Sequence, residues 1–181
     1  SYNNEYDAKV HGTAASVNVT EGTKVSYKVG EDGKWTEEVP TIKDVGSKEV
    51  TVKAENPNYE TAEGRYTLTV TPKAVTVTAE NKSKVYGEAD PKLTAVVSGT
   101  IGDDKVTYSL SRAKGEAVGD YVITASGEAE QGNYTVTYSP GTLTITKNGT
   151  LAVTGISYNN EYDAKVHGTA ASVNVTEGTK V

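Results

Sequence analysis

Most of the chain alternates apolar and polar residues with a period of two. The clearest run is Tyr66–Thr71, in which three apolar residues alternate with three threonines. Lys48–Ala54 alternates in the same way and places Val50 and Val52 on one face. Side chains of a β-strand point to its two faces in turn, so these runs predict half-buried strands. No stretch of ten or more residues has a helical period, and we therefore predict an all-β protein.

Turn residues divide the first 72 residues into several predicted strands. Gly30–Gly33 is rich in glycine, which supplies positive φ, and predicts a hairpin turn. The strand that returns from this turn would carry Trp35 and end at Pro40. Further strands are predicted at Ser16–Thr20, Lys24–Val29, Lys48–Ala54 and Tyr66–Thr71.

The following residues show the same kind of pattern. The boundary is Thr71–Lys73, which contains a proline. We expect a final hairpin in which Tyr134–Tyr138 pairs with Thr142–Thr146 across Pro140. Other strands are predicted at Ala74–Ala79, at Leu93–Val97, over Val106–Leu110, and around Tyr121 and Ile123.

The first 25 residues occur twice. Residues 1–25 recur letter for letter as residues 157–181, an offset of 156 (157 − 1). Independent duplicates diverge, so this identity implies recent duplication of whole units. A catalytic domain rarely needs identical copies in tandem, whereas a stalk, a fibre or a multivalent binder does. The sequence therefore predicts one period of a tandem array followed by the start of the next.

Each period is itself predicted to contain two diverged copies of one domain. The matched motifs are Val45-Gly46 with Val118-Gly119, Asn58-Tyr59 with Asn133-Tyr134, and Leu68–Val70 with Leu143–Ile145. We therefore expect a β domain at 1–72, a second at 73–149, and the opening strands of another copy of the first domain at 150–181. The domains would be small and mostly antiparallel, in an elongated array.

The stretch before the second copy of Ser1 alternates as a strand does, and Leu151 and Val153 are its apolar residues. No such stretch precedes Ser1 itself. Unpaired strand edges need partners. We therefore expect Leu151 and Val153 to be buried against a neighbouring copy, either within one continuous fibre or by strand complementation between chains. An isolated extension with both side chains in solvent would contradict this expectation.

Composition excludes several classes of function. The chain has no cysteine, so it has no disulfide framework and no thiolate metal site. Its net charge is −6 without a basic patch, so nucleic acid is not an expected partner. No apolar run is long enough to insert into a membrane. We expect no cofactor.

Candidate chemistry is sparse. His11 is the only histidine in the period, and a lone histidine in a Gly-flanked loop predicts a surface residue rather than a catalytic base. Asp103-Asp104 lacks the spaced carboxylates of a calcium loop and predicts a turn. Acidic pairs such as Glu37-Glu38 occur in any acidic protein and do not indicate a glycosidase. We expect that the protein is not an enzyme.

Aromatic residues give one candidate binding surface. The chain has no phenylalanine, and most of its tyrosines lie on the apolar phase of predicted strands, so tyrosine is the expected core aromatic. Trp35, Tyr2 and Tyr6 lie outside that phase. We expect these three to be exposed, and they are the candidate contacts for a ligand. The core tyrosines would be Tyr27, Tyr66, Tyr108, Tyr121, Tyr134 and Tyr138.

Three motifs of the second unit carry a resemblance to a known family. Lys84–Pro91, then Gly132–Tyr134, then the strand Thr142–Thr146 resemble the YGX type of MBG domain. The first unit is similar, more loosely, to the Ig-like or MBG-like repeats that accompany such domains. The resemblance implies an Ig-like sandwich, with a β-grasp-like fold as the alternative. It also implies a secreted and often wall-anchored adhesin or surface fibre, mostly from Gram-positive bacteria, and it carries no catalytic residues.

Two functional hypotheses follow. The first is a structural spacer in a surface adhesin or fibre, whose partners are neighbouring repeats or copies of itself. The second is a module that binds a glycan or a host glycoprotein through Trp35, Tyr2 and Tyr6. Lys–Asn isopeptide crosslinks would suit such a protein, but the sequence does not place a lysine, an asparagine and a buried carboxylate together.

Overall fold

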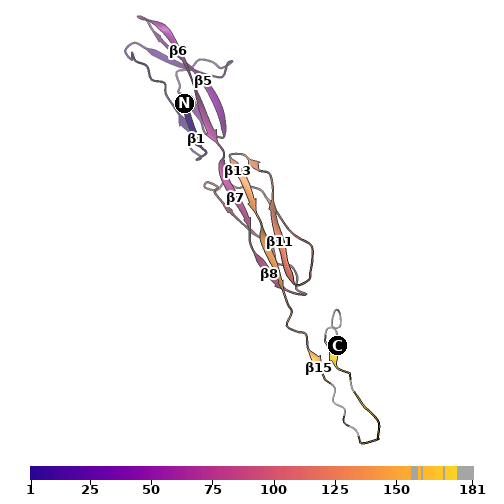
Figure 1. Ribbon diagram of the computed structural model, residues 1–181. Helices are drawn as coiled ribbons and strands as arrows, with labels where there is room; N and C mark the ends of the chain where they lie inside the picture. Colours follow the sequence, from indigo (N-terminus) through magenta and orange to yellow (C-terminus); the bar gives the residue numbers. More distant parts are fainter. Residues whose placement is uncertain (156–158, 160, 169, 175–181) are drawn as a thin grey trace.

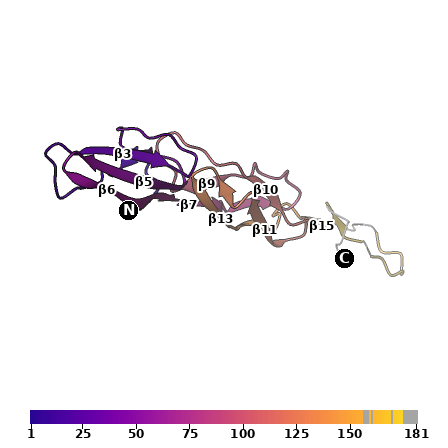
Figure 2. The same cartoon turned by 90° about the horizontal axis from the view of Figure 1, so that it is seen from above.

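The computed structural model describes residues 1–155, 159, 161–168 and 170–174. Every regular element in these ranges is a β-strand, which confirms the all-β prediction. The molecule is elongated, with the first unit at one end, the second in the middle and the described residues beyond Gly149 at the other end (Figure 1). A view from above shows the same sequence of units along one axis (Figure 2).

The first unit is built on one four-stranded sheet in the order β1-β6-β5-β3. Its centre is the long antiparallel pair of β5 and β6, and Val50 and Leu68 on these strands are fully buried, as the alternation predicts. A separate short pair joins β2 to β4. The strands are β1 (Tyr2–Glu5), β2 (His11–Gly12), β3 (Lys24–Val29), β4 (Thr41–Ile42), β5 (Gly46–Asn56) and β6 (Tyr59–Thr71).

The second unit consists of two four-stranded sheets, in the orders β12-β13-β7-β9 and β10-β11-β14-β8. β11 contacts both β7 and β13, so the sheets pack face to face as a sandwich. The strands are β7 (Lys73–Ala79), β8 (Lys82–Val85), β9 (Ala95–Ser98), β10 (Ser109–Arg112), β11 (Gly119–Ser126), β12 (Glu130–Gln131), β13 (Tyr134–Ser139) and β14 (Gly141–Thr146). Its fully buried residues are Val75, Val77, Ile123, Leu143 and Ile145.

The predicted final hairpin does not form. β13 and β14 follow each other directly but lie in different sheets: β13 pairs with β7 and β12, and β14 with β8 and β11. Pro140 lies between them and has no N–H for a ladder. At Gly141 a Cβ would lie 2.6 Å from the Ala79 carbonyl oxygen, so the two backbones cross closely where both change sheets.

Three of the pairings are parallel, namely β1 with β6, β7 with β13, and β8 with β14. Alternation shows which residues face the core but not the direction of the neighbouring strand. For these pairs the sequence therefore predicted most of the strands and their buried phase, but not the direction of the pairing.

Other predicted strands are shorter or missing. Residues 16–20 alternate but form no strand, because no strand among the described residues pairs with them. The strand expected to carry Trp35 is reduced to a single bridge between Tyr27 and Thr36. The strand predicted over Val106–Leu110 begins only at Ser109, as β10.

The described residues beyond Gly149 form little regular structure. Their regular structure is a two-residue pair between β15 (Val153–Thr154) and β16 (Ser172–Val173). Leu151 is 54% exposed and Val153 67% exposed, so the expectation that they are buried is wrong for the single chain. Whether they pair with another copy is a question about two chains and stays a prediction. Ile156 lies outside the described residues.

Candidate functional site

The two units are joined by a very short connection. β6 ends at Thr71 and β7 begins at Lys73, so only Pro72 lies between them. The proline ring restricts φ, which removes one of the rotations available to a linker. Backbone hydrogen bonds lie on either side of it, from Tyr6 N–H to the Thr71 carbonyl (2.9 Å) and from Lys73 N–H to the Asn133 carbonyl (3.0 Å).

Two tyrosines, one from each unit, meet beside this connection. The rings of Tyr6 and Tyr134 pack edge to face with centroids 5.6 Å apart, and the residues are only 5% and 4% exposed. Both hydroxyls donate to Oδ2 of Asp104, Tyr134 at 2.6 Å and Tyr6 at 3.5 Å. The Tyr134 oxygen also accepts a hydrogen bond from Ile101 N–H (3.1 Å). Tyr6 therefore reaches from the first unit into a hydrogen-bonded group of the second.

Asn133 makes a second set of contacts across the junction. Its Oδ1 accepts from the Val45 N–H (2.8 Å), and its Nδ2 donates to Oδ1 of Asp44 (3.0 Å). An ion pair between Lys73 Nζ and Glu5 Oε1 (2.7 Å) adds a third contact at the rim. We call Tyr6, Asp44, Val45, Asp104, Asn133 and Tyr134 the unit junction.

Burial changes the chemistry of the tyrosine at this junction. Desolvation raises the pKa of the Tyr134 hydroxyl, and the hydrogen bond to Asp104 raises it further. The phenol therefore stays protonated at neutral pH and remains a donor to the carboxylate. The raised pKa of Tyr134 therefore favours its hydrogen bond to Asp104.

Sequence reasoning located only part of the unit junction. Tyr6 was expected to be exposed and to contact a ligand, and this is wrong because the neighbouring unit covers it. Asp104 does follow a turn, with its N–H bonded to the Ile101 carbonyl, but its role as acceptor was missed. Two motifs that recur between the units, Val45-Gly46 and Asn133-Tyr134, contribute residues to this surface.

A second cluster of charges lies within the second unit. Lys84 is almost completely buried, and its Nζ donates to Oδ1 of Asp90 (2.7 Å), to Glu116 and to the Glu88 carbonyl. Arg112 donates through Nε to the other Asp90 oxygen (2.8 Å) and also binds Glu116. We call Lys84, Asp90, Arg112 and Glu116 the ion cluster. Arg112 and Glu116 were not singled out from the sequence.

The ion cluster keeps all of its members charged. The Arg112 guanidinium, and then Lys84, lower the pKa of Asp90 to about 2. Hydrogen bonds to Asp90 and then Glu116 raise the pKa of Lys84. In a Lys–Asn isopeptide bond an uncharged lysine amine displaces ammonia from an asparagine amide, but the ion cluster contains no asparagine and holds Lys84 in its charged form. The cluster therefore supports a salt-bridge network rather than an amide crosslink.

The three aromatic residues predicted to bind a ligand are not brought together. Tyr2 stacks on His11, with centroids 4.8 Å apart, and His11 is half-buried and bonded to Asp7 rather than free on the surface. Trp35 is 39% exposed, and the ammonium groups of Lys28 and Lys53 lie over its ring. Tyr2 is on β1, whereas Trp35 lies beside β3 at the opposite edge of the sheet. With Tyr6 buried, no shared aromatic platform is formed.

Comparison with protein families identifies the second unit. Residues 75–144 match the family model of the MBG domain (YGX type). The second unit contains an MBG domain of the YGX type. This confirms the resemblance drawn from its motifs. None of the curated proteins compared with the chain matches it.

The MBG domain is a non-catalytic repeat domain typical of bacterial surface proteins. The part of the chain that the structure describes contains no helix suited to crossing a membrane. The whole ion cluster and half of the unit junction lie inside the MBG domain, including Lys84, Asp90 and the Asn133-Tyr134 pair. The residues matched to the MBG domain therefore include one charged network within the domain and part of a contact surface at its end.

The tyrosines expected in the core are found there with one exception. Tyr27 and Tyr134 are buried, and Tyr66, Tyr121 and Tyr138 are partly buried against the core. Tyr108 is exposed, because it precedes β10 instead of lying within it. The hydroxyls reach polar partners, for example Tyr66 to the Thr13 carbonyl at 2.7 Å.

Proposed function

We propose that this chain is a semi-rigid structural spacer, a repeat segment of a bacterial surface adhesin or extracellular fibre. The unit junction is the observation that carries the proposal. A connection of one proline, closed by contacts from several separate segments, keeps two domains aligned along one axis. The exact tandem repeat in the sequence supports the same role, because a spacer gains length by adding identical units.

Bending at Pro72 would break several contacts at once. The tyrosine pair, the Asn133 bonds and the Glu5–Lys73 ion pair come from different sides of the connection. A net contribution of about 0.5–1.5 kcal/mol for each neutral hydrogen bond, and less for the exposed ion pair, makes their joint loss costly relative to thermal energy. The unit junction therefore limits the range of angles between the axes of the two units.

The proposed location is the bacterial cell surface, with the chain anchored to the wall or assembled into a fibre. The MBG domain supports this location, because domains of this family are typical of bacterial surface proteins. The proposed partners are neighbouring repeats or copies of the same chain. A spacer that holds another function away from the cell needs no catalytic residue of its own.

The stiffness of the junction can be tested by measuring distances between the units. Spin labels at Lys34→Cys and Lys114→Cys, two exposed positions in a chain without native cysteine, report the distance between the units. Pulsed electron resonance should give a narrow distance distribution. Tyr6→Ala combined with Asn133→Ala should broaden it, while Tyr59→Ala, an exposed tyrosine far from the junction, should leave it unchanged. A broad distribution in the unmodified chain would overturn the spacer proposal.

A module that binds a glycan or host glycoprotein is the second candidate function. Trp35 is the one exposed aromatic residue among the three predicted ligand contacts, all of which the structure describes. The ammonium groups of Lys28 and Lys53 lie over its ring. A glycan array probed with the chain and with Trp35→Ala tests this candidate. Binding that depends on Trp35 would favour it over a purely structural role.

A further inference from the structure

The first and last strands of the second unit run side by side in the same direction. β7 pairs in parallel with β13 over six residues, beginning with Lys73 opposite Tyr134. β8 pairs in parallel with β14 over four residues, ending with Val85 opposite Thr146. In both pairs the partners differ by 61 in residue number (134 − 73 and 146 − 85). The two strand pairs therefore keep one register from end to end, and we call them together the parallel ladder.

The parallel ladder is continued where the strands change sheets. Pro140 lies at this crossing and has no N–H to donate. Asn81 replaces the missing strand contact, because its Oδ1 accepts a hydrogen bond from Thr142 N–H (2.8 Å) and the two residues are again 61 apart. At the end far from the unit junction, Tyr86 N–H donates to the Thr146 carbonyl (2.8 Å). The ladder therefore extends along the whole length of the unit.

Most of the parallel ladder lies inside the unit. Val75 and Val77 on β7, and Leu143 and Ile145 on β14, are fully buried. β7 pairs with β9 on its other side, and β14 pairs with β11. Water therefore has little access to the ladder, and it cannot readily replace a strained hydrogen bond there.

The ion cluster braces the one exposed strand of the ladder. β8 lies at the edge of its sheet, and β10 lies at the opposite edge. Lys84 on β8 donates to Asp90 and Glu116, and Arg112 on β10 binds the same two carboxylates. The cluster therefore ties the edge strand of the ladder to the far edge of its own sheet.

Tension along the chain would act on the ladder in one particular direction. The chain enters the unit at Pro72 and leaves it at Lys147, and these points lie at opposite ends of the ladder. The strands run along the long axis of the molecule (Figure 1). A pull between Pro72 and Lys147 therefore slides the two sides of the ladder past each other. In this shear geometry all of its hydrogen bonds are strained together, whereas a pull across one end breaks them one after another.

We propose that the second unit bears tension, with the parallel ladder as its mechanical clamp. The proposal rests on the spacer role, because a segment that holds another function away from the cell transmits any force applied to that function. Resistance to force is governed by the barrier to unfolding rather than by equilibrium stability. The clamp raises this barrier for a pull along the chain, and not for a pull that opens the ladder from its end.

Changing the direction of the pull tests the clamp directly. The chain has no native cysteine, so force handles can be attached to pairs of introduced thiols. Thr71→Cys with Lys147→Cys loads the ladder in shear, and Tyr86→Cys with Lys147→Cys opens it from the far end; all three positions are exposed. At one loading rate in optical tweezers, the unfolding force should be higher in shear by about twofold or more. Adding Tyr86→Ser to the shear pair controls for the loss of the tyrosine ring.

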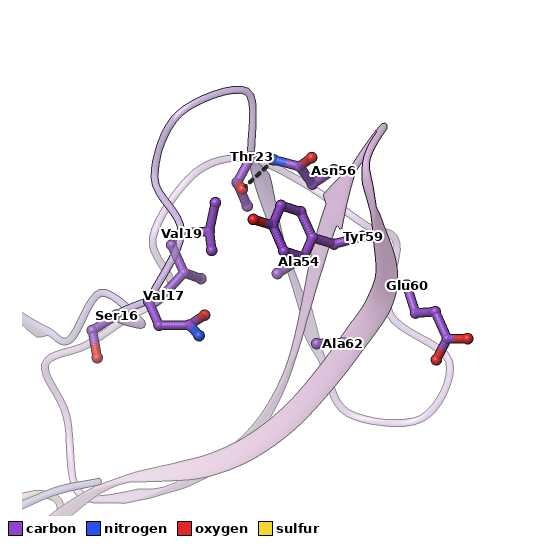
Figure 3. A pocket seen from close by; sticks show the side chains of 10 residues that line it. Ser16, Val17, Val19, Thr23, Ala54, Asn56, Tyr59, Glu60 and Ala62 are labelled. Atoms are coloured by element: carbon purple, nitrogen blue, oxygen red, sulfur yellow. Dashed lines mark hydrogen bonds between the residues drawn. The ribbon is translucent and has the colours of Figure 1, made fainter.

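Substitutions on and off the ladder test which contacts carry the load. Asn81→Ala should lower the unfolding force in shear more than Gln131→Ala does, although Gln131 makes several hydrogen bonds with Thr107 outside the ladder. Asn56→Ala should leave the force unchanged. Asn56 donates to Thr23 Oγ1 (2.8 Å) beside a hollow in the first unit, away from the loaded path (Figure 3).

Two results would overturn the clamp. One is an equal unfolding force in both directions of pulling, and the other is a loss of force with Gln131→Ala as large as with Asn81→Ala. Circular dichroism verifies that each variant folds before it is pulled. A narrow distance distribution between the spin-labelled units alongside either result would leave the spacer role standing. A broad distribution together with a higher force in shear would overturn the spacer role alone.

Discussion

At the scale of single residues, Asp104 connects the two units through its carboxylate. It accepts hydrogen bonds from Tyr134 in its own unit and from Tyr6 across the junction, and both tyrosines are buried. A buried hydroxyl that loses its acceptor retains the cost of its lost hydration. Asp104 should therefore contribute more to the free energy of unfolding than other residues in an exposed turn.

Asp104→Ala should lower the free energy of unfolding by about 1–3 kcal/mol, because two buried phenols lose their acceptor. Chemical denaturation of the whole chain measures the change. Asp103→Ala is the matched control, since Asp103 is exposed in the same turn. Similar losses for the two variants would contradict the role given to Asp104.

The ion cluster makes a prediction about pH. The pKa of Asp90 falls from an ordinary value of 3.8 to about 2, so its stabilising effect is complete above pH 3.8 and is lost as the pH falls toward about 2. Asp90→Asn should therefore lower Tm at neutral pH, and the difference in Tm should shrink to nothing as the pH falls below about 2. Thermal unfolding at a series of pH values measures this. Asp32→Asn, in the exposed turn after β3, serves as control, and a difference in Tm independent of pH would contradict the assignment.

At the scale of elements, the crossing of β13–β14 past β7–β8 organises the second unit. At Gly141 there is no room for a side chain, because a Cβ would clash with the Ala79 backbone across the crossing. That backbone cannot move without shifting two sheets. Glycine is needed wherever backbones approach this closely.

Gly141→Ala should destabilise the second unit by about 1–3 kcal/mol, the usual cost of forcing a methyl group into a filled site. Thermal or chemical unfolding measures the loss. Gly168→Ala is the control, because nothing lies within 4 Å of the position that its Cβ would take. If both variants are equally stable, the crossing is not as tight as described.

The sequence predicted the elements better than their partners. Periodicity found β5, β6, β7 and the buried phase of each, because that pattern depends only on which face meets the core. It could not show that β13 and β14 belong to different sheets, since this depends on the crossing at Gly141. Residues 16–20 show the same limit, because a strand forms only when an edge is present to pair with it.

The candidate site was harder to predict than the fold. Trp35, Tyr2 and Tyr6 were chosen as ligand contacts because they lie outside the apolar positions of the predicted strands. Such positions are exposed only where no other unit covers them. Tyr6 is covered by the MBG domain, and Arg112 joins Asp90 from a distant part of the chain. Contacts between units and between charges far apart in sequence leave no periodic signal.

At the scale of the whole molecule, the unit junction predicts one architecture. Each unit spans roughly 30–40 Å at about 3.3 Å per strand residue, so one period extends about 70 Å. If every junction is as closed as the one at Pro72, added periods extend the axis rather than folding back. Length would then grow in proportion to the number of repeats.

Small-angle X-ray scattering from a protein of two full repeats tests the spacer role most directly. The account predicts the scattering of a rod, with an unchanged cross-section and a maximum dimension about twice that of one repeat. A compact, globular profile, or the broad profile of units that swing freely about Pro72, would contradict it.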